Sequence, residues 1–264
     1  MDDYMSVCFT LKNRASFMKG KLNELKQMTY DPKKLEICVT DGGSTDGLKD
    51  TLKAFVPDFF QIKYAISDRL AVPFVIPENN PACDINAQVC NVATFEKVVR
   101  TDAEVRFCHT NSLRFVNQQL TANPELCVCF RSWHMKENWS PGMNVQGNAF
   151  SFAKMSFHCS CFTKTAFIQN RGVEEEFAKG FAAEDSYFHQ WWRRNRKLIH
   201  PPGGYEVLHT WHGKWQSESR LKLKHEFTLP MYKKFLKENH TPNENNPDWK
   251  RPEMIKDVEI WKQD

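Results

Sequence analysis

The sequence lacks any apolar run that approaches the roughly 20 residues needed to cross a membrane. Its mean hydropathy is −0.59. The chain also begins with an acidic stretch that turns at once into a strand-like pattern, which is not typical of a secretory signal. Internal repeats and low-complexity tracts are missing as well. We therefore predict a soluble, cytoplasmic protein.

Disulfide bonds are not expected either, although the chain contains nine cysteines. The count is odd, and most of the cysteines lie inside apolar runs, which is typical of reduced, buried thiols. The pairs Cys127/Cys129 and Cys159/Cys161 invite a zinc interpretation, but C-x-C lacks the two-residue spacer of a zinc knuckle. Buried thiols are the better interpretation.

What the sequence does contain is enough apolar material for a sizeable core. Hydrophobic residues make up 41% of the 264 residues and aromatic residues 13%, which argues against disorder. The formal net charge of +4 permits an anionic substrate or surface but does not require one.

Strand and helix patterns alternate through the first half of the chain. Apolar periodicity predicts strands over 5–14, 35–40 and 59–67, and helices over 14–28, 44–55 and 85–100. This alternation is the signature of a parallel α/β sheet. Further strands are expected over 103–115 and 125–135, and the order then becomes mixed. It includes a strand near 150–162, a short helix from Thr163, a helix opening at Glu184 or Asp185, a strand over 205–212 and a basic amphipathic helix from about Ser217.

The stretch "LEICVTDGGSTDGLKD" ends an apolar strand on Asp41 and continues with two glycines. Ligands of open α/β sheets bind at the carboxyl ends of strands. A carboxylate there can accept hydrogen bonds from a ribose hydroxyl or a base N–H, and Gly42 and Gly43 let the backbone come close to a ligand. Equally, Asp41 and Asp46 could simply cap a turn and a helix. Taken alone, the stretch leaves both interpretations open.

Two motifs together resemble a known family. "SVCFTLKNRASF" followed by "EICVTDGGSTDGLKD" resembles the opening of the GT-A glycosyltransferases of the family 2 type, and "GVEEEFAKGFAAEDSYF" resembles their Gly-x-Gly-Gly-Glu-Asp region. The resemblance covers about residues 5 to 215. It implies a GT-A fold: an α/β, Rossmann-like, mostly parallel central sheet flanked by helices, with a mixed acceptor-binding half. The activity implied is transfer of a sugar from a nucleotide diphosphate donor, with inversion.

The resemblance also implies a division of the chain and a donor pocket. Residues 1–122 would form the nucleotide-sugar-binding half, 123–216 the acceptor-binding and catalytic half of the same domain, and 217–264 a basic helical extension. Asp41 would contact the uridine of a UDP-sugar, with Asp68 near the base. The donor pocket would further include Thr10, Asn13, Arg14 and Gly43. Ordinary strand-end hydrogen bonding is the alternative role for Thr10 and Asn13.

At the expected metal site the sequence departs from the family, which usually places Asp-x-Asp at the end of its fourth strand. Aligning "VRFCHTNSL" on that strand puts His109 and Asn111 at the two positions. Related enzymes often supply a histidine after the catalytic helix; "EVLHTWH" offers His209 and His212, and the motif position favours His209 as the third ligand. Such a set favours Mn²⁺ over Mg²⁺. The alternative is a metal-free site in which Lys12, Arg14 or a histidinium neutralises the diphosphate. His134, His158 and His200 are interpreted as structural or surface histidines.

The resemblance assigns Asp185 as the general base and Glu184 as a residue that orients the acceptor. A helix opening at these acids would favour their ionised forms, although an acidic first turn is also common without any such role. Trp133, Trp139 and Trp211 are candidates for stacking against a sugar. The acceptor is expected to be a glycan or lipid-linked glycan, with peripheral membrane contact through the basic C-terminal helix as one use of that segment.

Two other functions stay open. Some viral relatives glycosylate hydroxymethylated bases, and the basic, aromatic C-terminal half would suit DNA. A glycan- or nucleotide-binding protein that retained the fold but lost catalysis would be consistent with the departure from Asp-x-Asp.

Overall fold

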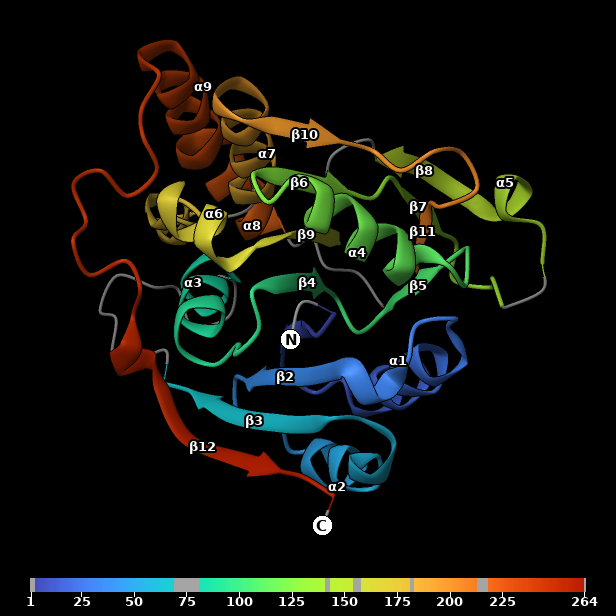
Figure 1. Cartoon of the computed structure of the whole chain (residues 1–264). Helices are drawn as coiled ribbons and strands as arrows, with labels where there is room; N and C mark the ends of the chain where they lie inside the picture. The colour runs from blue at the N-terminus through green and yellow to red at the C-terminus, as the bar shows by residue number, and fades with distance from the viewer. Residues whose placement is uncertain are drawn as a thin grey trace.

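Eight strands form a central sheet in the order β10-β6-β9-β4-β1-β2-β3-β12 (Figure 1). The computed structural model describes residues 3–68, 81–140, 143–153, 158–180, 183–212 and 218–263. The strands of this sheet are β1 (Met5–Leu11), β2 (Leu35–Asp41), β3 (Gln61–Ser67), β4 (Lys97–Thr101), β6 (Leu126–Cys129), β9 (Cys159–Thr163), β10 (Lys197–Ile199) and β12 (Ile255–Trp261). Strands β1 to β4 are mutually parallel, so their carboxyl ends meet at one edge.

Both faces of the central sheet are covered, as expected for parallel strands. Along β1, Val7 and Phe9 join one core and Cys8 joins the other, because successive side chains point to opposite faces. The helices are α1 (Ala15–Gln27), α2 (Leu48–Lys53), α3 (Pro81–Asn91), α4 (Ser112–Ala122), α5 (Val145–Asn148), α6 (Lys164–Gln169), α7 (Glu184–Asn195), α8 (Glu218–Leu223) and α9 (Leu229–Glu238). Helices α1, α2 and α4 contribute to the first core, and α3, α6 and α7 to the second. The predicted fold class is confirmed.

A smaller sheet continues from the carboxyl edge of β4. Its order is β5-β11-β7-β8, with β5 (Val105–Phe107), β7 (Ser132–Met135), β8 (Ala149–Ala153) and β11 (Val207–His209). Strands β11 and β7 are parallel, and His209 and His134 are direct partners. This sheet therefore brings two distant histidines to the same position.

The helix predicted over 85–100 is wrong in its second half. Helix α3 ends at Asn91, and residues 97–101 form β4, buried throughout. The apolar residues of "EKVVRT" fit a helical period, although a short run with two adjacent valines suits a strand buried on both faces. The stretch "VRF", predicted to be the fourth strand of the central sheet, is β5 of the smaller sheet.

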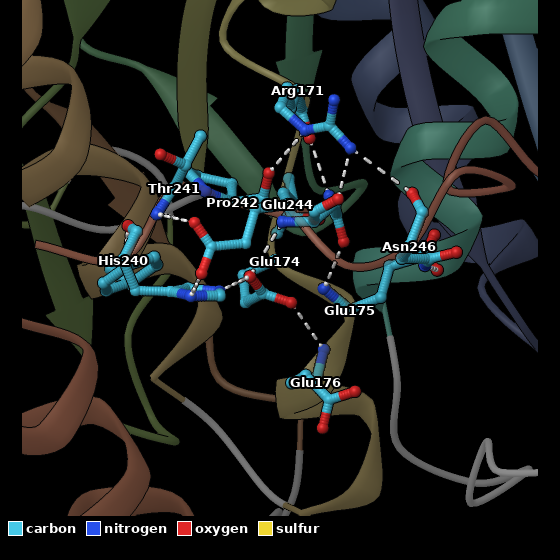
Figure 2. Close-up of polar contacts among 12 residues, drawn as sticks. Arg171, Glu174, Glu175, Glu176, His240, Thr241, Pro242, Glu244 and Asn246 are labelled. Carbon is cyan, nitrogen blue, oxygen red and sulfur yellow. Dashed lines mark hydrogen bonds and ion pairs between the residues drawn. The ribbon is translucent and has the colours of Figure 1, made fainter. Parts of the chain in front are cut away.

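The C-terminal segment is a further departure from expectation. Helices α8 and α9 are joined by a π-helical turn over Lys224–Thr228, and the tail then runs along one side of the molecule and adds β12 antiparallel to β3 (Figure 1). Figure 2 shows how the segment is attached: Glu174, 2% exposed, accepts from the Asn243 backbone N–H (2.9 Å) and pairs with His240 Nε2 (2.7 Å). Arg251 pairs with the buried Glu175 at 2.8 Å. The segment is therefore integral to the fold.

Candidate functional site

Asp41 anchors the turn that follows β2. Its side chain is 1% exposed; Oδ1 accepts hydrogen bonds from the Ser44 N–H (2.9 Å) and Oγ (2.6 Å), and Oδ2 accepts from the Tyr64 hydroxyl (2.7 Å). Burial and the hydrogen bond to Asp41 raise the Tyr64 pKa, which keeps that hydroxyl a donor. A carboxylate can end this dry strand because both of its oxygens have donors.

The loop after β1 is tied to this turn. Asn13 has a left-handed backbone (φ 53°); its N–H donates to Ser44 Oγ (2.8 Å), and its Oδ1 accepts from the Thr45 N–H (2.9 Å). Gly43 has φ 88°, and apart from its chain neighbours no heavy atom lies within 4 Å of the position that a Cβ would occupy, so its surroundings are open. Half-buried Thr10 is the partner of Thr40 at the strand end. The predicted donor residues Thr10, Asn13, Asp41 and Gly43 therefore lie together at the carboxyl edge.

Asp68 and Arg14 lie on either side of this group. Asp68 follows β3, where its N–H donates to the Met254 carbonyl (2.8 Å) and its carboxylate pairs with Lys256. Arg14 points to the smaller sheet: its Nε is 3.8 Å from Glu104 Oε1, and its Nη2 is 3.4 Å from His212 Nδ1. Arg14 thereby links the donor loops to a cluster of acids and histidines.

That cluster begins with Asp102-Ala103-Glu104, directly after β4. Arg100 Nη2 is 2.7 Å from Asp102 Oδ1, and His158 Nδ1 is 2.9 Å from Asp102 Oδ2. Burial acts to raise the Asp102 pKa, but Arg100 and His158 outweigh it and hold the pKa well below its usual range. Glu104 Oε1 lies 3.3 Å from His212 Nε2. An acidic pair thus follows the fourth strand, where the family resemblance places one.

The predicted metal set of His109, Asn111 and His209 is not assembled. His109 stacks on Tyr205 with ring centroids 4.3 Å apart, while His209 is the partner of Val105. His109 lies two residues beyond the C-terminal end of β5, whereas His209 pairs with Val105 at the N-terminal end of that strand. Asn111 Oδ1 accepts from the Thr29 hydroxyl (2.5 Å). The alignment places "VRF" on the fourth strand of the central sheet, but this stretch is β5; Asp102-Ala103-Glu104 is the D-x-E that directly follows β4.

Four histidines surround the acidic pair instead. Within the described residues, two overlapping groups have ligand atoms all within 4.8 Å of one another: Glu104, His209 and His212, and His134, His158 and His209. Burial and the neighbouring His158 lower the pKa of His134 to about 4 and that of His209 well below its usual value. These imidazoles are therefore neutral near pH 7, as metal ligation requires. His134 and His158, interpreted above as structural or surface residues, belong to this cluster.

Helix α7 begins at Glu184, as predicted, and its first turn contains the half-buried acids Glu184 and Asp185. Burial and the charge of Asp185 raise the pKa of Glu184 to about 8, against the opposing effect of Arg100. Asp185 in turn raises the His134 pKa against the effect of burial. Glu184 and Asp185 therefore lie close enough to Arg100, Asp102 and His134, near the carboxyl end of β4, for their charges to interact.

A cavity of about 270 Å³ adjoins the cluster, lined by Phe17, Arg106, Glu137, Trp139, Ser140, Thr210 and Trp211. Thr210 and Trp211 lie between His209 and His212 in the chain, and the Phe17 ring is 6.4 Å from that of His212. The Trp139 Nε1–H is buried without a hydrogen-bond partner among the described residues. Two indoles and several polar groups suit a sugar ring.

The cysteine pairs lie elsewhere. Cys127, Cys129, Cys159 and Cys161 are buried and unbridged on β6 and β9. Metal-binding groups found in the described part of the chain include none of them. Burial raises the pKa of Cys127 and Cys161 well above the usual thiol value. They are buried core thiols, as interpreted from their spacing.

The fold is that of known glycosyltransferases. The mannosyltransferase PcManGT from Pyrobaculum calidifontis, in complex with GDP-Man and Mn²⁺, has a TM-score of 0.60 and 16% identity over 95% of this chain and 69% of its own. A fragment of S. aureus TarS in complex with UDP-GlcNAc has a TM-score of 0.55 and 14% identity, over 83% and 60% of the two chains. The chain spans 37% of the longer TarS chain, at a TM-score of 0.54.

No protein-family model and no curated protein matches the sequence. The likeness to solved structures, at 14 to 16% identity, therefore establishes the fold and not the substrate. In the described part of the chain, no helix is both long and apolar enough to cross a membrane.

Proposed function

We propose that the protein is an inverting glycosyltransferase that moves a sugar from a nucleotide diphosphate donor, a UDP-sugar, to an acceptor hydroxyl. The observation that carries the proposal is the convergence of Asp102, Glu104 and Asp185 at the carboxyl edge that also holds Asp41. Likeness in fold to proteins solved with GDP-Man and UDP-GlcNAc supports it. The nucleoside would lie over the turn fixed by Asp41 and Asn13, with Thr10, Gly43 and Asp68 around it.

The diphosphate would point toward Glu104. Glu104, His209 and His212 offer one carboxylate oxygen and two imidazole nitrogens in one place, a set that fits a divalent ion and favours Mn²⁺ over Mg²⁺. When bound, such an ion offsets the charge that grows on the leaving diphosphate. Arg14, beside Glu104, contributes a fixed positive charge to the same phosphates. In the metal-free alternative, Lys12, Arg14 or a histidinium would neutralise the diphosphate without an ion.

Asp185 would act as the general base. Its Oδ1 accepts from the Ser186 N–H at 2.6 Å, which holds the carboxylate at the N-terminus of α7, where the helix dipole favours the ionised form. Glu184, with its raised pKa of about 8, is protonated at pH 7 and can donate a hydrogen bond to the acceptor. A Glu184 carboxyl that donates to the acceptor, beside Asp185 as the base, gives the two adjacent acids separate roles in acceptor orientation and proton abstraction.

The acceptor would occupy the cavity lined by Trp139 and Trp211, which favours a glycan. The alternative of an inactive binding protein rests on the departure from the Asp-x-Asp pair; the acids Asp102 and Glu104 after β4 support an active enzyme instead. Helix α9 buries Phe235 and exposes Lys233, Lys234 and Lys237, so peripheral membrane contact through this face remains a prediction.

The experiment is a panel of UDP-sugars and GDP-mannose incubated with the protein and Mn²⁺, with release of the nucleotide diphosphate as the readout. We expect turnover with one UDP-sugar and its loss in Asp185→Asn, with UDP affinity unchanged. The matched control is Glu176→Gln, which changes an acid outside the cluster whose carboxylate pairs with Lys179 at the surface. Equal turnover in wild type and Asp185→Asn would remove Asp185 from this role.

A further inference from the structure

We propose that His134, His158 and His209 form a binding site for a Zn²⁺-class ion, which shares only His209 with the oxygen-containing group at Glu104. Each histidine offers one ring nitrogen, and the three nitrogens lie within 4.8 Å of one another. The rings pack together, with centroid distances of 4.1 Å for His158–His209, 5.2 Å for His134–His209 and 5.0 Å for His134–His158. Side-chain rotations would bring the three nitrogens to about 2.0–2.1 Å from a central ion, which is the Zn–N distance in proteins.

Three different elements hold these imidazoles in place. His209 and His134 are direct partners in the parallel pair of β11 and β7. His158 precedes β9, where its carbonyl accepts from the Asp102 N–H (3.2 Å) and from Thr101 Oγ1 (3.0 Å). The backbone of all three positions is thus fixed by sheet pairing or by hydrogen bonds, so the site is built into the scaffold rather than carried on a free loop.

The hydrogen bond between His158 and Asp102 selects the ring nitrogen available to a metal. An ionised carboxylate only accepts hydrogen bonds, so His158 Nδ1, 2.9 Å from Asp102 Oδ2, carries the proton. The Nε2 lone pair is then left for coordination. Arg100 holds the other oxygen of Asp102 at 2.7 Å. A carboxylate behind a ligating histidine is the usual outer shell of a protein zinc site.

The donor set selects the class of ion. Three imidazole nitrogens and no carboxylate suit Zn²⁺, Co²⁺ or Ni²⁺ and disfavour Mg²⁺, which prefers oxygen. His209 belongs to both groups, so an ion held by the three histidines removes a ligand from the Glu104 group. Zn²⁺ would then inhibit Mn²⁺-supported turnover by competition. Only this last consequence rests on the proposed function; binding of the ion does not.

The test uses the full chain and the metal alone. We expect one equivalent of Co²⁺ to give the intense visible absorption of a low-coordinate nitrogen site, and Zn²⁺ to displace it. His134→Ala and His158→Ala should abolish the absorption, and Asp102→Asn should weaken Zn²⁺ binding about 10- to 100-fold. His225→Ala, which changes an exposed histidine outside the cluster, is the matched control, and His212→Ala should retain the Co²⁺ spectrum.

Thermal unfolding of each metal-free variant shows whether it is folded, and a second pair of substitutions, His134→Gln and His158→Gln, repeats the test with less change in volume. Folded His134 and His158 variants that bind Zn²⁺ as tightly as wild type would overturn the proposal. So would loss of binding in His212→Ala alone, because the ion would then belong to the Glu104 group. Either result leaves the UDP-sugar turnover experiment unaffected, so the two proposals fail separately.

Discussion

His158 Nδ1 lies 2.9 Å from Asp102 Oδ2, and this contact joins the start of β9 to the end of β4. Asp102 is thereby shared between two roles: it belongs to the acidic pair after the fourth strand, and it orients an imidazole of the neighbouring cluster. Substitutions near Asp102 are therefore expected to affect the sugar-donor site, and substitutions near His158 the histidine cluster.

Glu104→Gln is expected to lower kcat about 100-fold or more, because it removes the only carboxylate of the Glu104, His209 and His212 group. The measurement is the initial rate as a function of Mn²⁺ concentration. The variant should require more Mn²⁺ for half-maximal rate, and chelation by EDTA should abolish wild-type turnover. Wild-type turnover that survives EDTA would favour the metal-free site with Arg14 instead.

Trp139→Phe is expected to weaken acceptor binding while leaving slow donor hydrolysis unchanged. The substitution keeps an aromatic surface but deletes the Nε1–H that is buried without a partner among the described residues. The expected loss is about 1 kcal/mol, or roughly fivefold in KM for the acceptor. Trp139→Ala should cost more because stacking is lost as well. If both variants transfer normally, the acceptor does not enter the cavity of Trp139 and Trp211.

His240→Gln, which removes the contacts of His240 with Glu174 and Glu244 drawn in Figure 2, is expected to destabilise the protein more at pH 5 than at pH 9. Burial lowers the His240 pKa, but the ring nitrogens lie 2.7 Å from Glu174 and 2.7 Å from Glu244, and these partners raise the net pKa. The stability that His240 contributes is therefore fully present below its unfolded pKa of about 6.5 and is lost as pH rises through the folded pKa.

At pH 5 the His240→Gln cost should be about 1.5–3 kcal/mol, as for hydrogen bonds between charged groups. Urea unfolding across pH 5 to 9 measures it, with His225→Gln as the exposed control. A cost for His240→Gln that does not change with pH would show that the His240 pKa is not raised on folding.

Gly172→Ala is expected to destabilise the fold by a few kcal/mol, because a Cβ there meets Asn86 Oδ1 and comes within 2.5 Å of Trp249, at a backbone φ of 67°. Gly203→Ala should be nearly neutral, because apart from the chain neighbours no heavy atom lies within 4 Å of the position that its Cβ would occupy. Guanidinium unfolding of the two variants makes the comparison. Equal midpoints would mean that the contact of Trp249 with the 171–173 loop is not rigid.

The local sequence was enough to predict much of the secondary structure of the nucleotide-sugar-binding half. The apolar run Leu35–Asp41 followed by glycine predicts a strand and a tight turn, and the structure has both. The start of α7 at Glu184 was also predictable, since two acids in a first turn are a helix-opening signal. The error at β4 arose because residues 97–101 were assigned the helical period of the preceding segment. Five residues are too few to distinguish a helix from a strand that is buried on both faces.

The sequence by itself determined the alternating order of strands and helices, the turn at Asp41, the two acids of α7 and the unbridged core cysteines. These follow from spacing and residue type within a few turns or strand lengths. Only the tertiary structure decided that His134, His158 and His209 meet, that Asp102 orients one of them, and that residues 255–261 complete the central sheet. Strands that are far apart in the chain pair according to which strand edges and apolar surfaces the rest of the fold leaves to be covered. The local periodicity of the sequence contains no information about that pairing.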